Sequence, residues 1–246
     1  MSRLPHCVAR HPRQTHALLE RAARLRALAL GFCYPEPGHR LHFLRQLARV
    51  REHASGRARA RIERLRRAWG EASEARLPAE YARLFLGNSA CPPRETAYGD
   101  ARRIAGRPAE LADVGGFYAA FGVAPSAAEP DLPDHVCAEL EFYSLLLVKQ
   151  AYAEASARRA QRSIARRAAH AFLEQHLARW IAAFARSVAE AGAPDAYRLL
   201  ANAIVEEITE ECRRMRARPR PHEGRLPFDE MQASELLCPR ASTAAT

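Results

Sequence analysis

Apolar residues recur at spacings of three and four along most of the 246-residue chain, and no stretch alternates apolar and polar residues over more than a few positions. This spacing places apolar side chains on one face of an α-helix. Glycine and proline residues interrupt the pattern and indicate where helices end. The sequence therefore predicts an all-α fold, with helices over residues 14–30, 39–53, 56–75, 78–86, 108–121, 133–153, 156–191 and 195–216, a break in the seventh being left open.

The second and third helices carry more detailed expectations. The inward face of the second should hold Leu41, Leu44, Leu47 and Ala48. The third is rich in arginine and should point Ile62, Leu65 and Trp69 inward. Because charged residues at helical spacing usually face water, we expect its arginines to form a solvated face.

The sixth helix has the strongest pattern. Its inward face should hold Val136, Leu140, Tyr143 and Leu147. Pro133 is expected in the first turn, where a missing N–H costs little, with Asp131 or Leu132 in the cap region.

The chain shows no internal repeat and no long linker before the sequence Arg218-Pro219-Arg220-Pro221. We therefore expect a single globular helical domain over residues 1–217 and a proline-containing, mobile tail over residues 218–246. The N-terminus has no apolar stretch of the usual leader length, and the apolar run that ends at Val148 is followed directly by Lys149. Neither a signal peptide nor insertion into a membrane is predicted.

Charge is distributed unevenly along the chain. The formal net charge is +10, and the basic residues are 37 arginines and one lysine, a bias that reflects composition more than phosphate binding. Residues 1–76 carry a net charge of +11, whereas residues 77–155 carry −5. An acidic segment favours a cationic partner over nucleic acid. An arginine-rich nucleic-acid-binding protein that uses residues 1–76 remains an alternative.

The six cysteines, at positions 7, 33, 91, 137, 212 and 238, show no Cys-x-x-Cys pair. This spacing indicates reduced thiols, as in a cytoplasmic protein.

The acidic segment contains two irregular stretches, near residues 90–107 and 124–135. In the first, Pro92-Pro93 pre-orders a turn that is followed by Glu95 and Tyr98. These two residues either contribute to a binding site or have local roles, Tyr98 packing in the core and Glu95 capping a turn.

The second stretch crowds acidic residues and a histidine around the start of the sixth helix: Glu129, Asp131, Asp134, His135 and then Glu139. His135 and Glu139, spaced i and i+4, could ligate a metal in a helical enzyme, but two ligands are too few and no further metal motif follows. No phosphate-binding glycine loop or nucleophile motif occurs in the chain. We therefore predict neither a metal nor a catalytic function.

The order of short motifs from residue 78 to about 150 resembles the TorD/DmsD/NarJ family of cytoplasmic chaperones for molybdenum oxidoreductases. The matching stretches are Tyr81–Phe85, Pro92–Tyr98, Leu111–Gly122 and Glu129–Phe142. The runs Cys91–Gly99 and Gly116–Gly122 look most like chaperones of periplasmic enzymes that act on dimethyl sulfide, selenate, chlorate or ethylbenzene.

The resemblance implies a TorD-like, non-enzymatic helical chaperone that uses no cofactor of its own. Such a chaperone binds the twin-arginine leader, or another segment, of the apo catalytic subunit and delays its export until the molybdopterin cofactor is inserted. Contact with carriers of the molybdenum cofactor is left open, as is the choice between monomer and homodimer.

A leader of this kind has paired arginines followed by an apolar stretch, so its receptor needs carboxylates beside an apolar groove. We predict Asp134 and His135 at the rim of the site, Glu129 and Asp131 as charge partners, and Glu139 nearby. Glu95 and Tyr98 would contribute from the adjacent stretch. The groove candidates are Phe117, Tyr118, Phe121, Phe142 and Tyr143.

Overall fold

The computed structural model describes residues 12–99, 107–124, 133–222 and 224, and this part of the chain is built from helices, with no strand. The all-α prediction is confirmed. The helices are α1 (Pro12–Leu30), α2 (His39–His53), α3 (Gly56–Glu71), α4 (Leu77–Phe85), α5 (Arg107–Ala120), α6 (Val136–Ala155), α7 (Arg159–Phe172), α8 (Ala178–Glu190) and α9 (Asp195–Met215). Two shorter elements are a 3-10 turn, η1 (Glu95–Ala97), and a π-helical turn, η3 (Leu173–Leu177), which joins α7 directly to α8.

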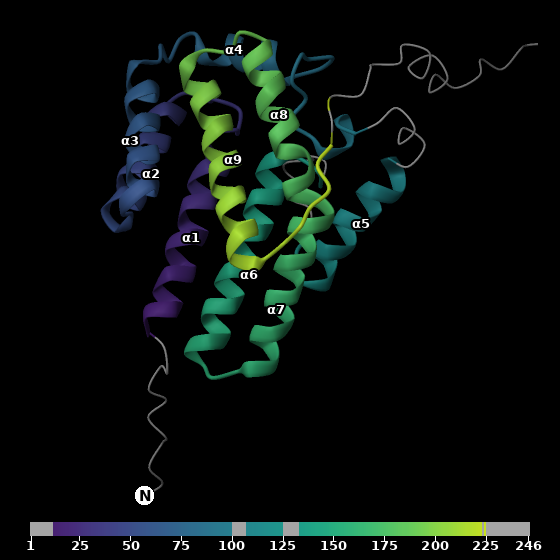
Figure 1. The fold of residues 1–246 in the computed structure, drawn as a ribbon. Coiled ribbons are helices and arrows are strands. Elements are labelled where there is room, and N and C mark those ends of the chain that lie inside the picture. The colour runs from purple at the N-terminus through teal and green to yellow at the C-terminus, as the bar shows by residue number, and fades with distance from the viewer. Residues whose placement is uncertain (1–11, 100–106, 125–132, 223, 225–246) are drawn as a thin grey trace, which may run out of the picture.

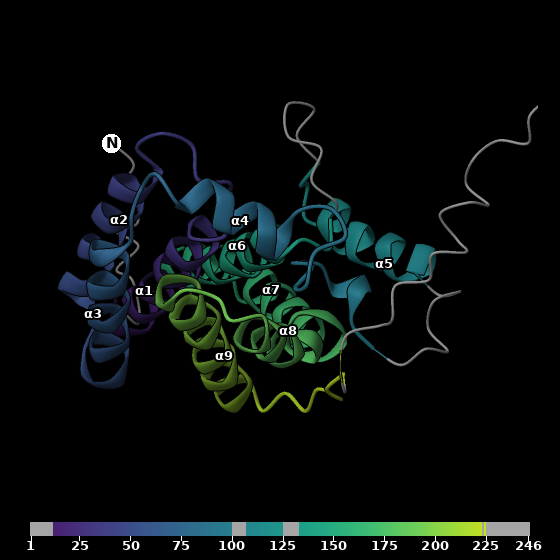
Figure 2. The same ribbon diagram turned by 90° about the horizontal axis from the view of Figure 1, so that it is seen from above.

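In the described part of the chain, the centre of the molecule is formed by α1, α6, α7, α8 and α9. α1 packs along α6, α6 along α7, and α8 along α9. The pair α2 and α3 lies on one flank and α5 on the opposite flank, while α4 crosses one end of the bundle (Figures 1 and 2). None of the described helices is both long and apolar enough to cross a membrane.

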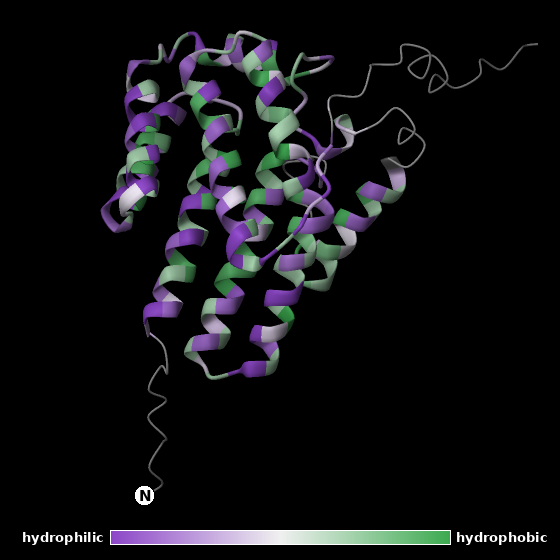
Figure 3. Cartoon of the chain, viewed as in Figure 1, coloured by the Kyte–Doolittle hydropathy of each residue, from purple (hydrophilic) through white to green (hydrophobic). Residues whose placement is uncertain are grey.

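The core forms where the apolar sides of the helices meet, and hydrophobic and hydrophilic residues occupy different sides of most helices (Figure 3). On α6 the predicted inward residues are all fully buried: Val136, Leu140, Tyr143 and Leu147. Ile62, Leu65 and Trp69 of α3 are buried as predicted, and the Trp69 indole N–H donates to the Ala196 carbonyl at 3.0 Å. Burial of this apolar surface is the main stabilising contribution.

Several local predictions are wrong. Leu41 is 49% exposed and takes no part in the inward face of α2. The α6 helix begins at Val136, and its cap is His135, whose Nδ1 accepts a hydrogen bond from the Cys137 N–H at 3.2 Å. Pro133 therefore precedes the helix and is not in its first turn.

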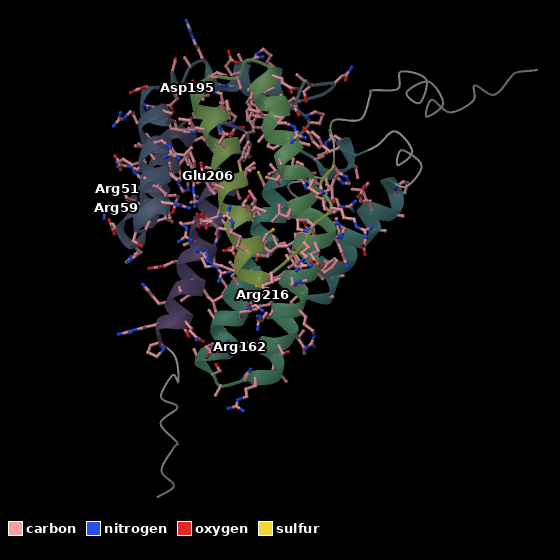
Figure 4. All side chains as sticks on the ribbon, in the orientation of Figure 1. Arg51, Arg59, Arg162, Asp195, Glu206 and Arg216 are labelled. Carbon is pink, nitrogen blue, oxygen red and sulfur yellow. The ribbon has the colours of Figure 1, made fainter. Side chains whose placement is uncertain are left out.

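The arginines of α3 do not all face water. Arg61 is 3% exposed and pairs with Glu207 of α9, whose other carboxylate oxygen accepts from Arg24 of α1 at 2.8 Å. On the rim of this network, Glu206 pairs with Arg61 at 3.2 Å and with Arg64 at 3.3 Å. Figure 4 labels Glu206 on α9. Part of the positive charge of residues 1–76 is thus neutralised inside the protein by a helix more than a hundred residues away.

A short segment beyond α9 returns along the outside of the bundle (Figure 1). The Arg218 N–H donates to Glu174 Oε1 at 2.6 Å, and the His222 N–H donates to the Arg179 carbonyl at 2.7 Å. Further along, the Gly224 carbonyl accepts from the Gly99 N–H at 2.9 Å. We call residues 218–222 the return segment; the rest of the predicted tail, apart from Gly224, lies outside the described residues.

Candidate functional site

The stretch that contains Pro92-Pro93 is fastened to the start of α6. The Pro93 carbonyl accepts from the Val136 N–H at 2.9 Å, and the Glu95 N–H donates to the Asp134 carbonyl at 3.0 Å. The Asp134 carboxylate then accepts from the Thr96 N–H at 3.0 Å and from the Thr96 hydroxyl at 2.6 Å. A carboxylate that accepts such bonds in a buried setting fixes the loop geometry strongly.

Asp134 and His135, predicted at the rim of a site, both lie inside the protein. Asp134 has no exposed surface and His135 is 8% exposed. Their contacts connect the first irregular stretch to α6 and cap that helix, so the two residues set the shape of this region from within.

Tyr98 also lies in the core. Its ring stacks on Trp180 at a centroid distance of 5.6 Å, and its hydroxyl accepts from the Ser187 hydroxyl at 3.3 Å. Of the alternatives left open for Tyr98, the structure favours packing.

Glu95 is fully buried and faces a histidine that the sequence analysis did not single out. His176 Nδ1 lies 2.9 Å from Glu95 Oε2, and His176 Nε2 lies 3.2 Å from Asp113 Oδ2 on α5. His176 belongs to η3, 81 residues from Glu95 along the chain. No local motif surrounds it, so only the fold could reveal this contact.

Glu139 is a second fully buried carboxylate in this region, and its Oε2 accepts from the Trp180 indole N–H at 3.1 Å. Burial raises the pKa of Glu139 well above its usual range, and the negative charge of Glu95 raises it further. Burial likewise raises the pKa of Glu95, although His176 opposes the shift. We call Glu95, Asp134 and Glu139 the buried carboxylate cluster.

An apolar groove of about 550 Å³ opens beside this cluster, between α1, α6 and the end of α5. Two of the five groove candidates, Tyr118 and Phe142, line the groove, and the centroids of their rings lie 4.6 Å apart. Its other apolar side chains are Val123, Pro133, Leu145 and Val148, with Cys33, Cys137 and the methyl groups of Ala124 and Ala138. The acidic side chain of Glu141 and the basic side chain of Arg26 also line the groove.

The other groove candidates lie elsewhere. Phe117 packs against Phe172 and His176, each at a centroid distance of 5.4 Å. Phe121 is half-buried at the edge of the Phe142 ring. Tyr143 is completely buried and donates its hydroxyl to Glu211 at 3.1 Å, so it belongs to the core.

Glu129 and Asp131 lie outside the described residues. Ala124 and Pro133, which flank residues 125–132 in the sequence, both line the groove.

Comparison with known proteins identifies relatives of this chain. The selenate reductase assembly chaperone protein of Thauera selenatis is 34% identical over 110 residues, which is 45% of this chain and 56% of the relative. The perchlorate reductase assembly chaperone protein of Dechloromonas aromatica (strain RCB) is 39% identical over 75 residues, 30% of this chain and 33% of the relative. The matches thus span about half the length of the first relative and a third of the second.

A solved structure described as a candidate redox enzyme maturation protein from Archaeoglobus fulgidus aligns with 76% of this chain and 93% of its own, at a TM-score of 0.46 and 18% identity. The family model for the nitrate reductase delta subunit matches residues 51–186, which is more than half of the chain and includes both irregular stretches, η3 and most of α8. The chain therefore belongs to the nitrate reductase delta subunit family.

Proposed function

We propose that this protein is a non-enzymatic assembly chaperone for the catalytic subunit of a molybdenum oxidoreductase, and that it acts in the cytoplasm before the subunit is exported. The family match and the two relatives named as assembly chaperones support this function. The structural observation that carries it is the apolar groove, lined by Tyr118 and Phe142 and bordered by an acidic side chain.

The proposed occupant is the twin-arginine leader of the catalytic subunit. The apolar stretch of the leader would cover the groove wall formed by Tyr118, Phe142 and Val148, the last of which is 40% exposed without a partner chain. Burial of apolar surface drives such an association. The paired arginines would lie toward Glu141, Glu129 and Asp131, because guanidinium groups pair best with carboxylates.

The buried carboxylate cluster has a different part in this proposal. Asp134 is inaccessible to a peptide and fixes the stretch after Pro93 against the start of α6. Its substitution would alter leader binding only by moving the groove wall at Pro133, whose carbonyl accepts from the Tyr118 hydroxyl at 2.6 Å.

Fluorescence anisotropy with a labelled leader peptide of the co-purifying catalytic subunit tests the proposal. Val148→Asp places a charge on the groove wall and should weaken binding by about tenfold or more, equivalent to about 1.4 kcal/mol. Ile164→Asp is the matched control, because Ile164 is an apolar side chain 51% exposed on α7 that does not line the groove. Equal affinities of the two variants would show that the leader binds elsewhere.

Ionic strength provides a second measurement on the same peptide. If exposed carboxylates pair with the leader arginines, affinity should fall as salt rises through the physiological range, since exposed pairs are screened over about 8–10 Å. Glu141→Gln should reduce this salt dependence, and an unchanged dependence would place the arginines away from Glu141.

A further inference from the structure

Three segments that are far apart in the sequence bring possible metal ligands together beside the buried carboxylate cluster. Glu95 comes from η1, Glu110 from α5 and His222 from the return segment, and one ligand atom of each lies within 4.8 Å of the others. We propose that these three side chains form a binding site for a divalent transition-metal ion. This site is separate from the apolar groove, and its occupancy does not depend on leader binding.

The geometry of Glu95 supports the site. Its side chain is fully buried, and its Oε2 lies 2.9 Å from His176 Nδ1. Its other oxygen, Oε1, accepts no hydrogen bond from any residue that the structure describes. A buried carboxylate oxygen without a donor is costly, and a bound cation would satisfy it.

His222 is also held in place rather than hanging free in solvent. Its side chain is 6% exposed, and its backbone N–H donates to the Arg179 carbonyl on α8 at 2.7 Å. The preceding residues attach to the same face, since Arg179 Nε donates to the Arg220 carbonyl at 3.3 Å. The return segment thus presents an imidazole to Glu95 and Glu110 on a fixed backbone.

The surrounding charge favours a cation. Asp134 and Glu139 are fully buried nearby, and Asp134 Oδ1 and Glu139 Oε1 also lack donors among the described residues. A neighbouring cavity of about 1020 Å³ is lined by the positive side chains of Arg179, Arg218 and Arg220 together with the acidic side chains of Glu110, Asp113 and Glu174. Because Glu110 and His176 both line this cavity, it offers an ion a path from solvent to the cluster.

The ligand chemistry selects the class of metal. One imidazole nitrogen and two carboxylate oxygens suit Zn²⁺, Mn²⁺ or Fe²⁺, whereas Mg²⁺ and Ca²⁺ prefer sites made of oxygen alone. Three protein ligands leave at least one coordination position for water. His176 would be a positioning residue, since it holds Glu95 Oε2 and orients the carboxylate.

An ion bound here would connect the return segment to η1 and α5. We therefore expect zinc to protect residues after Met215 from proteolysis and to raise the melting temperature, because a ligand that binds only the folded state stabilises it.

The test is a calorimetric titration of Zn²⁺ into tag-free, chelator-treated full-length protein, with metal content measured in parallel on protein purified without chelator. The parent should bind one zinc ion. The affinity for zinc should be lower by tenfold or more in His222→Ala and in Glu110→Gln. The melting temperature of the parent should rise with zinc, and that of His222→Ala should not. The metal-free variants should melt within a few degrees of the metal-free parent, which separates loss of a ligand from loss of the fold.

His53→Ala is the matched control. His16, Glu20 and His53 form a second cluster of possible ligands, but it lies on the surface, and the His16 side chain is 64% exposed. The proposed zinc site should persist in this variant. A parent that binds no zinc, equal affinity of the parent and His222→Ala, or loss of binding only in His53→Ala would each overturn the proposal.

Discussion

Removal of the Glu207 carboxylate should destabilise the protein more than removal of any exposed acid on the same helix. Glu207 has no exposed surface, and its two oxygens bind Arg24 and Arg61, which are 8% and 3% exposed. In Glu207→Ala the guanidinium groups of Arg24 and Arg61 stay buried, but each loses its bond to the Glu207 carboxylate. Arg61 retains Glu206 at 3.2 Å, whereas Arg24 loses the one carboxylate to which the structure shows it bonded within the described part of the chain.

The size of the effect follows from burial. Breaking a buried ion pair by removing one partner costs about 3–5 kcal/mol, mostly because a charge is left without compensation. For a domain of 150–250 residues, about 1 kcal/mol lowers the melting temperature by about 2–4 °C, so Glu207→Ala should lower it by about 6–20 °C. Circular dichroism at 222 nm during thermal and urea unfolding measures both quantities.

Glu206→Ala is the control for this prediction. Glu206 precedes Glu207 on α9 and binds Arg61 and Arg64, but its side chain is 46% exposed. Exposed pairs contribute about 0–1 kcal/mol. If the two variants unfold at the same temperature and urea concentration, the buried network is not a major source of stability and the reasoning is refuted.

Two further substitutions test the core. Glu139→Gln keeps an oxygen that can accept from the Trp180 N–H, but the glutamine side chain cannot ionise. The pKa of Glu139 in the folded protein is raised above 4.5 by burial, so the parent loses stability as pH rises above that value. The variant should therefore unfold at higher urea than the parent at pH 8, with the difference shrinking toward pH 4.5, and a constant difference would contradict the assignment. Gly31→Ala would place a methyl group 2.7 Å from Leu200 Cδ2 and 2.9 Å from Phe43 Cζ, so overpacking should cost about 1–3 kcal/mol in urea unfolding, and a neutral result would show that these side chains can move aside.

The helices were predictable because their signals are local. Residues 39–53 were predicted with the bounds that the structure shows, since Gly38 precedes the helix and the apolar pattern stops after His53. The buried role of Arg61 was not predictable in the same way. Its partner Glu207 lies 146 residues away, and only packing of α3 against α9 brings the two together.

The candidate site was predictable only in part for the same reason. The motifs located Asp134 and Tyr118 in the right region, but whether each side chain faces solvent depends on neighbours from other helices. Asp134 is buried and accepts a hydrogen bond from Thr96, which lies in an irregular stretch 38 residues earlier. His176 and His222 carry no local signal, and each acquires its neighbours through η3 or the return segment.

The π-helical turn η3 has a consequence for how insertions and deletions would act on this chain. An α-helix advances about 100° per residue, so Phe172 and Trp180 on an unbroken α-helix would point about 80° apart. One extra residue in a π turn cancels about 100° of that rotation, which brings both fully buried rings to the same side of the rod formed by α7 and α8. Deleting a single residue within 173–177 would leave seven steps of about 100° between these two rings, so a regular α-helix would still keep both on the core side. Inserting a residue there while the π turn remains would instead turn one half of the rod by about 100°, away from the core. At this point the length of the chain matters more than the identity of its residues.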